Sequence, residues 1–324
     1  MKKHLLLSVL LLSSLSVMAQ QARISSVVSF TPNEDDTTLP ADTTTQQFTY
    51  TADGKIATTN IKMVEYDSEG RTTTNVNLAF TYSGNTITGK ADLSATKPGG
   101  ATSTSTENIV YTLTNGLITK EQLTGSDESG TYQYTYDADN RLNTITYSTA
   151  GEADETTTVT WNNGNITDMM QASDGQNLQH YVYTYTSEEG SEQIKAFESP
   201  LNELSDFEWF TPGYMASMGY YGKLCSALTH TSEIRTVDYD TEYDGEVYTY
   251  NYGFNADGTR VQKVECAGTT TEITWTDETN GIHTTTIKGG TSRIFNLNGI
   301  RLPELQHGIN IIRLTDGSVH KVLH

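Results

Sequence analysis

The sequence predicts an all-β protein, a long antiparallel meander that is curved or barrel-like and carries one short helical insert. The first observation is a recurring unit in which aromatic and polar residues alternate, a turn follows, and a second alternating run returns. It is clearest where Tyr132, Tyr134 and Tyr136 share one face of a strand and Asp139-Asn140 supplies a turn with positive φ. The second observation is the high content of Thr and Tyr, which favour strands.

The repeated units explain why a meander is expected. Asn-Gly and Asp-Gly fit type I′ turns, whose twist suits adjacent antiparallel strands. The further units are Phe48/Tyr50 with Asp53-Gly54, Tyr66 with Glu69-Gly70, Phe80/Tyr82 with Gly84-Asn85, Tyr111 with Asn115-Gly116, Trp161 with Asn163-Gly164, Tyr185 with Glu189-Gly190, Tyr252 with Asp257-Gly258, and Trp275 with Asn280-Gly281. A sheet of so many strands must curl or close to avoid exposed edges.

The 324 residues divide into three parts. Residues 1–19 predict a cleaved secretory signal peptide, with a basic start, an apolar run and a small-residue cleavage site. The apolar run is shorter than the ~20 residues of a membrane span, so we expect no transmembrane helix after cleavage. Residues 20–288 form the meander, and residues 289–324 form a short β tail of three alternating runs, which is a candidate sorting segment. The alternative is that the tail extends the main sheet.

Two segments interrupt the meander. In residues 199–230, Thr211-Pro212 has the features of a helix start. Tyr214, Met215, Met218 and Tyr221 then follow at helical spacing. We expect this helical insert to plug or cap the curved sheet. Residues 93–107, which contain Pro-Gly-Gly and a Thr/Ser run, indicate a long hairpin loop.

The composition limits the classes of partner. The formal net charge is −20, which argues against nucleic acid as a partner. Cys225 and Cys266 are the two cysteines of the chain. In an exported protein they are able to form one disulfide, and the sequence leaves that pairing open. No cofactor is expected.

Three stretches resemble known families. The unit Tyr134-Thr-Tyr-Asp-Ala-Asp-Asn-Arg-Leu142 resembles the YD (Rhs) repeat of bacterial surface and toxin-shell proteins. Met218-Gly-Tyr-Tyr-Gly-Lys-Leu224 resembles a family of exported Bacteroidota proteins described as porin-like in fold, over roughly residues 45–288. The tail, from Phe295-Asn-Leu-Asn-Gly-Ile-Arg301 onward, resembles type IX secretion sorting domains, with Asn310 in a place usually held by Tyr. These resemblances imply export and a porin-like fold, and they bring no catalytic residues.

Six tyrosines are the candidate ligand contacts. They form two ladders, Tyr181, Tyr183 and Tyr185 in one strand and Tyr248, Tyr250 and Tyr252 in another. Tyr suits both binding surfaces and cores, so a plain core face is the alternative. The acidic run 238–245 approaches a calcium loop, but Glu242 and Asn251 stand at its third and twelfth positions, which favours a solvated turn. No metal site is predicted.

No catalytic motif occurs, and we therefore expect a protein that is not an enzyme. The predicted function is a noncatalytic binding or structural protein of the Gram-negative cell envelope, secreted or periplasmic or associated with the outer membrane. Its expected partner is a glycan or a small apolar ligand. The alternatives are a small-ligand carrier with an aromatic-lined cavity and a glycan-active hydrolase. An enclosed apolar pocket would favour the carrier, and two converging carboxylates would favour the hydrolase.

Overall fold

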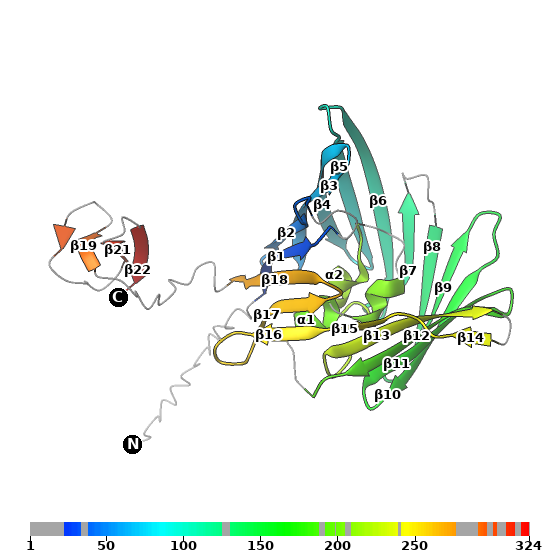
Figure 1. The fold of residues 1–324 in the computed structure, drawn as a ribbon. Coiled ribbons are helices and arrows are strands. Elements are labelled where there is room, and N and C mark those ends of the chain that lie inside the picture. The colour runs from blue at the N-terminus through cyan, green and yellow to red at the C-terminus, as the bar shows by residue number, and fades with distance from the viewer. Residues whose placement is uncertain are drawn as a thin grey trace, which may run out of the picture.

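The computed structural model describes residues 23–33, 38–124, 130–187, 192–197, 199–204, 209–238, 241–276 and, in the tail, 291–296, 301–302, 309–314 and 319–323. The predicted signal peptide, 1–19, lies outside these residues. The main body is one antiparallel sheet of 18 strands (Figure 1). The predicted fold class, an all-β antiparallel meander, is confirmed.

Almost every strand of the sheet pairs with its neighbours in the chain. The strands are β1 (Ile24–Thr31), β2 (Asp42–Tyr50), β3 (Ile56–Asp67), β4 (Gly70–Ser83), β5 (Thr86–Thr96), β6 (Thr102–Thr114), β7 (Leu117–Thr124), β8 (Gly130–Tyr136), β9 (Leu142–Thr149), β10 (Glu155–Asn162), β11 (Asn165–Ser173), β12 (Gln176–Tyr185), β13 (Thr229–Asp238), β14 (Thr241–Tyr243), β15 (Val247–Thr249), β16 (Asn251–Phe254), β17 (Val261–Cys266) and β18 (Thr269–Trp275).

The sheet closes on itself. β1 pairs with both β2 and β18, which joins the two ends of the meander. β15 and β16 are pieces of one strand interrupted at Tyr250: β15 pairs with β13, and β16 pairs with β17. The Tyr250 amide donates to the carbonyl of His230 at 2.9 Å, which continues the pairing across the interruption. Closure removes the open edges that a flat sheet of this size would expose.

The turns that the structure describes adopt the backbone that their sequences predict, while the predicted turns at Glu189-Gly190 and Asn280-Gly281 lie outside the described residues. In the Asn-Gly turns, Asn115 and Gly116 both have positive φ (53° and 82°), as do Asn163 and Gly164. Asn140 has φ 60° in the turn between β8 and β9. Residues 93–107 correct the expected long loop: β5 runs to Thr96 and β6 starts at Thr102, so a short turn joins two long strands. A Thr/Ser run is compatible with a strand because both of its faces are solvated here.

A hydrogen bond from an aromatic side chain recurs in seven of the hairpin units. That side chain donates to a backbone carbonyl near the start of an earlier strand. The donor–acceptor pairs are Tyr50–Ile24, Tyr82–Ile56, Tyr136–Ile118, Trp161–Leu142, Tyr185–Ile166, Tyr252–Thr229 and Trp275–Val261, at 2.5–2.9 Å. We call these bonds the aromatic clasps. They join neighbouring hairpins along one end of the sheet, where all the carbonyl residues are buried.

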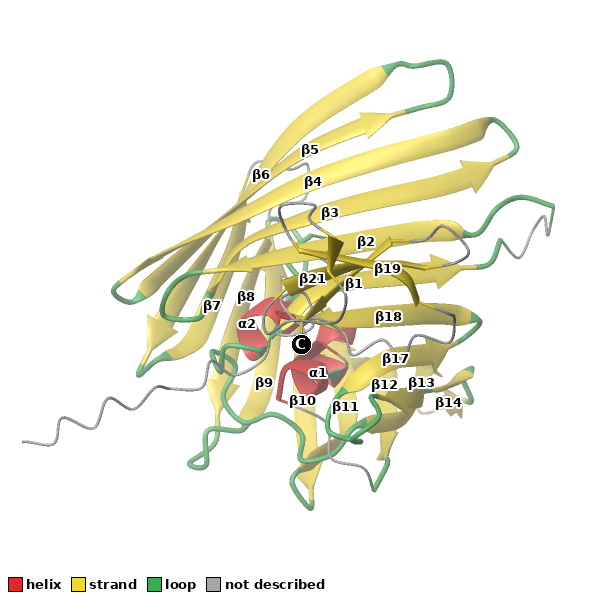
Figure 2. Cartoon of the chain, turned by 90° about the vertical axis from the view of Figure 1, so that its left-hand side faces the viewer, coloured by secondary structure: helices red, strands yellow, loops and turns green. Residues whose placement is uncertain are grey.

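The helical insert fills this end of the sheet from inside (Figure 2). It consists of α1 (Glu192–Phe197), a 3₁₀ turn (Pro200–Leu204) and α2 (Pro212–Ala216). The insert begins before residue 199, which is the start that the sequence predicted. Helix α2 ends at Ala216, so the later residues that have helical spacing in the sequence lie in turns. The side chains of Phe210 and Tyr214 pack edge to face on Phe80 of the sheet, with ring centroids 6.3–6.4 Å apart.

The insert also satisfies amides at the starts of four strands. The N–H of Ile24 donates to Oε1 of Gln193, and that of Ile118 donates to the carbonyl of Tyr220, both at 2.8 Å. Sulfur atoms accept from two more amides. The N–H of Ile56 donates to Met218 Sδ at 3.2 Å, and that of Ile166 donates to Cys225 Sγ at 3.5 Å. Because these amides lie at the strand starts, the insert closes one end of the sheet, which we call the insert end. The opposite end is called the open end.

The tail strands form a separate four-stranded sheet rather than extending the main one. It contains β19 (Thr291–Asn296), β20 (Arg301–Leu302), β21 (Ile309–Leu314) and β22 (Val319–Leu323), one strand more than the three runs of the sequence. No disulfide joins Cys225 and Cys266, so the pairing that the sequence left open is not formed. Among the described residues, no helix has the length and apolar character needed to cross a membrane.

Candidate functional site

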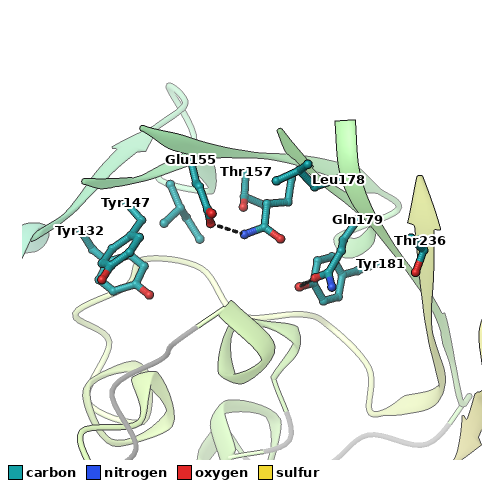
Figure 3. A pocket seen from close by; sticks show the side chains of 10 residues that line it. Tyr132, Tyr147, Glu155, Thr157, Leu178, Gln179, Tyr181 and Thr236 are labelled. Carbon is teal, nitrogen blue, oxygen red and sulfur yellow. Dashed lines mark hydrogen bonds between the residues drawn. The ribbon is translucent and has the colours of Figure 1, made fainter. Parts of the chain in front are cut away.

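A cavity of about 440 Å³ lies on the inner face of β8–β13, and we call it the open-end cavity. Its residues come from the first parts of β8, β10 and β12 and from the later parts of β9, β11 and β13, at the open end of the sheet. They are Tyr132, Ile145, Tyr147, Glu155, Thr157, Gln171, Leu178, Gln179, Tyr181 and Thr236 (Figure 3). The insert closes the other end, so the sheet has the form of a cup with this cavity toward its mouth.

The floor of the cavity is one row of directly paired residues. Each member is the cross-strand partner of the next, and the row runs Ile145, Thr157, Gln171, Gln179, Thr236 across β9–β13. Paired residues on adjacent strands point to the same face of a sheet. The register shifts between Gln171 and Ala172, so that Leu178 is an extra residue in β12. Such a bulge re-aims side chains, and it lets Leu178 and its neighbour Gln179 both line the cavity.

Two hydrogen bonds fix the polar groups of the floor. Gln171 Nε2 donates to Glu155 Oε2 at 2.7 Å, and the Tyr181 hydroxyl donates to Gln179 Oε1 at 2.5 Å. Each bond uses one polar atom of a side chain and leaves the other for a ligand or water. The remaining atoms are the acceptors Gln171 Oε1 and Glu155 Oε1 and the donor Gln179 Nε2.

Aromatic rings bound the row at both ends. Tyr132 and Tyr147, which are cross-strand partners, have ring centroids 4.6 Å apart at one end. Tyr181 lies at the other, and the Glu155–Gln171 pair lies between them (Figure 3). The cavity therefore has aromatic side chains at its ends and hydrogen-bonding groups along its floor, which is the usual composition of a small-molecule site.

A buried acid stands behind the Tyr132 ring. Glu121 is the cross-strand partner of both Tyr111 and Tyr132, and its side chain is 1 % exposed. Burial raises the pKa of Glu121 to about 8, against a hydrogen bond with Tyr134 that acts in the opposite direction. Its carboxyl group is therefore mostly protonated at neutral pH, and it does not line the open-end cavity.

The first predicted tyrosine ladder divides between cavity and core. Tyr181 lines the open-end cavity, whereas Tyr183 is buried in the core. Tyr185 forms an aromatic clasp with Ile166, and its hydroxyl lies 3.4 Å from Cys225 Sγ. The three share an inward face, as the alternation predicted, but their positions along β12 take them from the open end to the insert end.

The second ladder lies elsewhere. Tyr250 and Tyr252 line a shallower cavity of about 410 Å³ with Thr186, Ser187, His230 and Asn251. The hydroxyl of Tyr252 forms an aromatic clasp with Thr229. The hydroxyl of Tyr248 donates to Glu246 at 3.2 Å. The structure thus does not bring the six tyrosines together into one platform.

Residues 239 and 240 of the acidic run 238–245 lie outside the described residues. The described part of the run does not form a calcium loop. Glu242 instead accepts a hydrogen bond from Arg235 at 2.8 Å. This bond and the neighbouring His180 hold the pKa of Glu242 below its ordinary value. The described residues contain no cluster of three or more acidic, His or Cys side chains placed to hold a metal ion.

Sequence reasoning missed the polar floor. Glu155, Thr157, Gln171 and Gln179 carry no recognisable motif, and their meeting depends on strand pairing and register. The one available signal was alternation within each strand, which places them inward without showing which strands face one another.

Comparison with known proteins identifies the fold. Residues 48–262 match the model of DUF4595, a domain of unknown function with porin-like fold. A crystal structure of a porin-like protein from Bacteroides uniformis is similar at 17 % identity with a TM-score of 0.51, covering 78 % of this chain and 97 % of that one. A porin-like protein from Bacteroides vulgatus matches at 12 % identity with a TM-score of 0.44 and the same coverage. The search of curated proteins found no match.

Proposed function

The chain belongs to this family of porin-like fold, and we propose that it is a noncatalytic exported protein of the Gram-negative cell envelope that binds a small polar ligand. The observation that carries the proposal is the open-end cavity, with its polar floor and aromatic ends. Its volume falls within the range of about 300–1,000 Å³ typical of small-molecule sites. The insert end is packed, so a ligand enters and leaves through the open end.

The lining favours a polar ligand over an apolar one. Ile145 and Leu178 are its aliphatic members, while the floor residues between the aromatic ends carry carboxylate, amide and hydroxyl groups. An apolar ligand would strip water from these groups without replacing its hydrogen bonds, which is costly. The carrier of apolar molecules is therefore the weaker proposal.

The cavity also lacks the arrangement of a glycoside hydrolase. Such enzymes use a pair of carboxyl groups, typically about 5–9.5 Å apart. Glu155 is the one carboxylate among the described residues that line the open-end cavity, and it is tied to Gln171. This composition supports binding without catalysis.

Export and destination complete the proposal. The signal-like residues 1–19 support export, and the tail, 289–324, resembles a sorting domain of type IX secretion. We propose that the tail directs the protein to the outer membrane or the cell exterior, while the YD-like units supply the hairpins of the sheet. The separate sheet formed by β19–β22 supports a role for the tail independent of the cavity.

Native mass spectrometry of protein purified from its own source tests the proposal. Thr157, a buried floor residue, is replaced by Trp to fill the cavity; Thr158→Trp, on the exposed outer face of the same strand, is the matched control. We expect a retained small molecule on the wild type and on the Thr158 variant but not on the Thr157 variant. A wild-type protein without added mass, or an adduct that survives Thr157→Trp, contradicts ligand binding in this cavity.

A further inference from the structure

We propose that the ligand of the open-end cavity is a neutral sugar, held through its hydroxyl groups by Glu155, Gln171 and Gln179. This inference rests on the proposed binding function and specifies the chemical class of the ligand. It is drawn from the hydrogen-bonding atoms left over on the floor, from the charge of the cavity and from the positions of the rings.

The hydrogen-bonding pattern requires a ligand that both donates and accepts. Because Gln171 Nε2 is used on Glu155, Gln171 presents its carbonyl oxygen as an acceptor. Because Tyr181 donates to Gln179 Oε1, Gln179 presents its Nε2 as a donor. Adjacent hydroxyl groups on a sugar ring donate to the first and accept from the second, since each hydroxyl has one proton and two lone pairs. The two glutamines are direct cross-strand partners, so they address neighbouring positions of one ligand.

The charge of the cavity opposes an anionic ligand. Glu155 places a carboxylate on the floor, and no Lys, Arg or His occurs among the described residues that line the cavity. A ligand carboxylate or phosphate would face this charge without a cation to balance it. A cationic ligand is the competing class, because Glu155 keeps its charge while it accepts the amide of Gln171, and glucosamine tests it below.

The aromatic side chains at the ends of the floor suit the C–H groups of a sugar. Tyr132 and Tyr147 stand at one end of the floor and Tyr181 at the other (Figure 3). Sugars present C–H groups on one face of the ring and hydroxyl groups around the edge, so an aromatic side chain packs on the face while amides and carboxylates bind the edge. The same cavity thus provides for both parts of the molecule.

Isothermal titration calorimetry on the full mature chain tests the ligand class. The probes are D-glucose, D-galactose, D-mannose, maltose and cellobiose, compared with glucuronate, glucosamine and the apolar dye N-phenyl-1-naphthylamine. We expect at least one neutral sugar to bind more tightly than the charged and apolar probes. Gln171→Leu and Gln179→Leu should each weaken that binding about tenfold or more.

Gln133→Leu is the matched control because Gln133 lies exposed on β8, on the face away from the cavity. It should leave the affinity unchanged, and melting curves of all three variants verify that they fold. If glucuronate, glucosamine or the dye binds more tightly than the neutral sugars, and Thr157→Trp abolishes that binding, the ligand is not a neutral sugar. The proposed binding function then still stands. If none of the probes binds and the native protein also carries no added mass, both proposals are overturned.

Discussion

Glu121 shows how one residue links the interior of the sheet to pH. Its side chain lies among tyrosines in the core, and burial raises its pKa to about 8 from an ordinary value of 4.5. The unfolded chain would release this proton near pH 4.5, whereas the folded chain retains it until about pH 8. The contribution of Glu121 to the free energy of unfolding is therefore largest at the acidic side of this interval, and it decreases as the pH rises.

Glu121→Gln should flatten this pH dependence. In the wild type the group lowers the free energy of unfolding by up to about 1.4 kcal/mol for each pH unit between pH 4.5 and 8. A neutral amide of similar shape removes that slope, so the variant should gain stability relative to the wild type as the pH increases. Urea melts at pH 5 and pH 7.5 measure the difference. Equal pH slopes for the two proteins would show that Glu121 ionises normally in the folded state.

Two glycines with similar backbone angles should respond differently to substitution. Gly222 (φ +77°) would place a Cβ 2.2 Å from the carbonyl oxygen of Asn140, whereas Gly258 (φ +73°) has nothing within 4 Å. Gly222→Val should therefore cost more than the ~1–2 kcal/mol of the left-handed conformation alone, while Gly258→Asn should cost little. Thermal melting compares the two variants, and equal melting temperatures would contradict the close contact between insert and turn.

At the scale of the elements, the aromatic clasps turn a repeated sequence into a repeated structure. Tyr132, Tyr134 and Tyr136 all alternate in the sequence, but the structure gives them different roles. The first lines the cavity, the second packs against Tyr221 of the insert, and the third donates to the Ile118 carbonyl. The sequence predicted the strand and the turn because alternation and turn chemistry are local. It did not predict the roles, since these depend on which hairpins become neighbours.

Tyr136→Phe tests the clasps directly because it removes one hydroxyl and leaves the ring. The Ile118 carbonyl loses a donor at 2.7 Å, and the expected loss of stability is about 1–3 kcal/mol. Tyr243→Phe is the control, since Tyr243 is 54 % exposed. Chemical denaturation of both variants gives the comparison. A Tyr136 variant as stable as its control would mean that the clasps contribute no net free energy.

The elements also show where sequence reasoning reached its limit for the site. Gln171 and Gln179 face the cavity together because they pair directly across β11 and β12, whereas Leu178 joins them through a bulge that no residue type at that position announces. Helix α2 had a clear start at Pro212 in the sequence, but the packing of the insert on Phe80 and its hydrogen bonds to strand starts depend on closure of the sheet. Closure is a property of the whole chain, so local sequence patterns could not predict the cup or its cavity.

For the whole molecule, the closed sheet and the tail behave as separate sheets. A chain that ends at Gly289 should therefore stay soluble and melt cooperatively at the temperature of the full chain. In its host it should accumulate in the periplasm, because it lacks the proposed sorting segment. Calorimetry and cell fractionation measure the two outcomes. Aggregation or loss of the melting transition would make the tail structural and would remove the main support for the sorting role.

The central claim is that the open end of the sheet holds the ligand, and methyl NMR measures this directly. Ile145 and Leu178 line the open-end cavity, while Ile56 and Ile118 lie at the insert end and serve as internal references. On titration of the methyl-labelled protein with the five neutral sugars, we predict shift changes at Ile145 and Leu178 and none at Ile56 and Ile118. Changes confined to the insert end, or no changes at Ile145 and Leu178 at saturating sugar, would contradict the account.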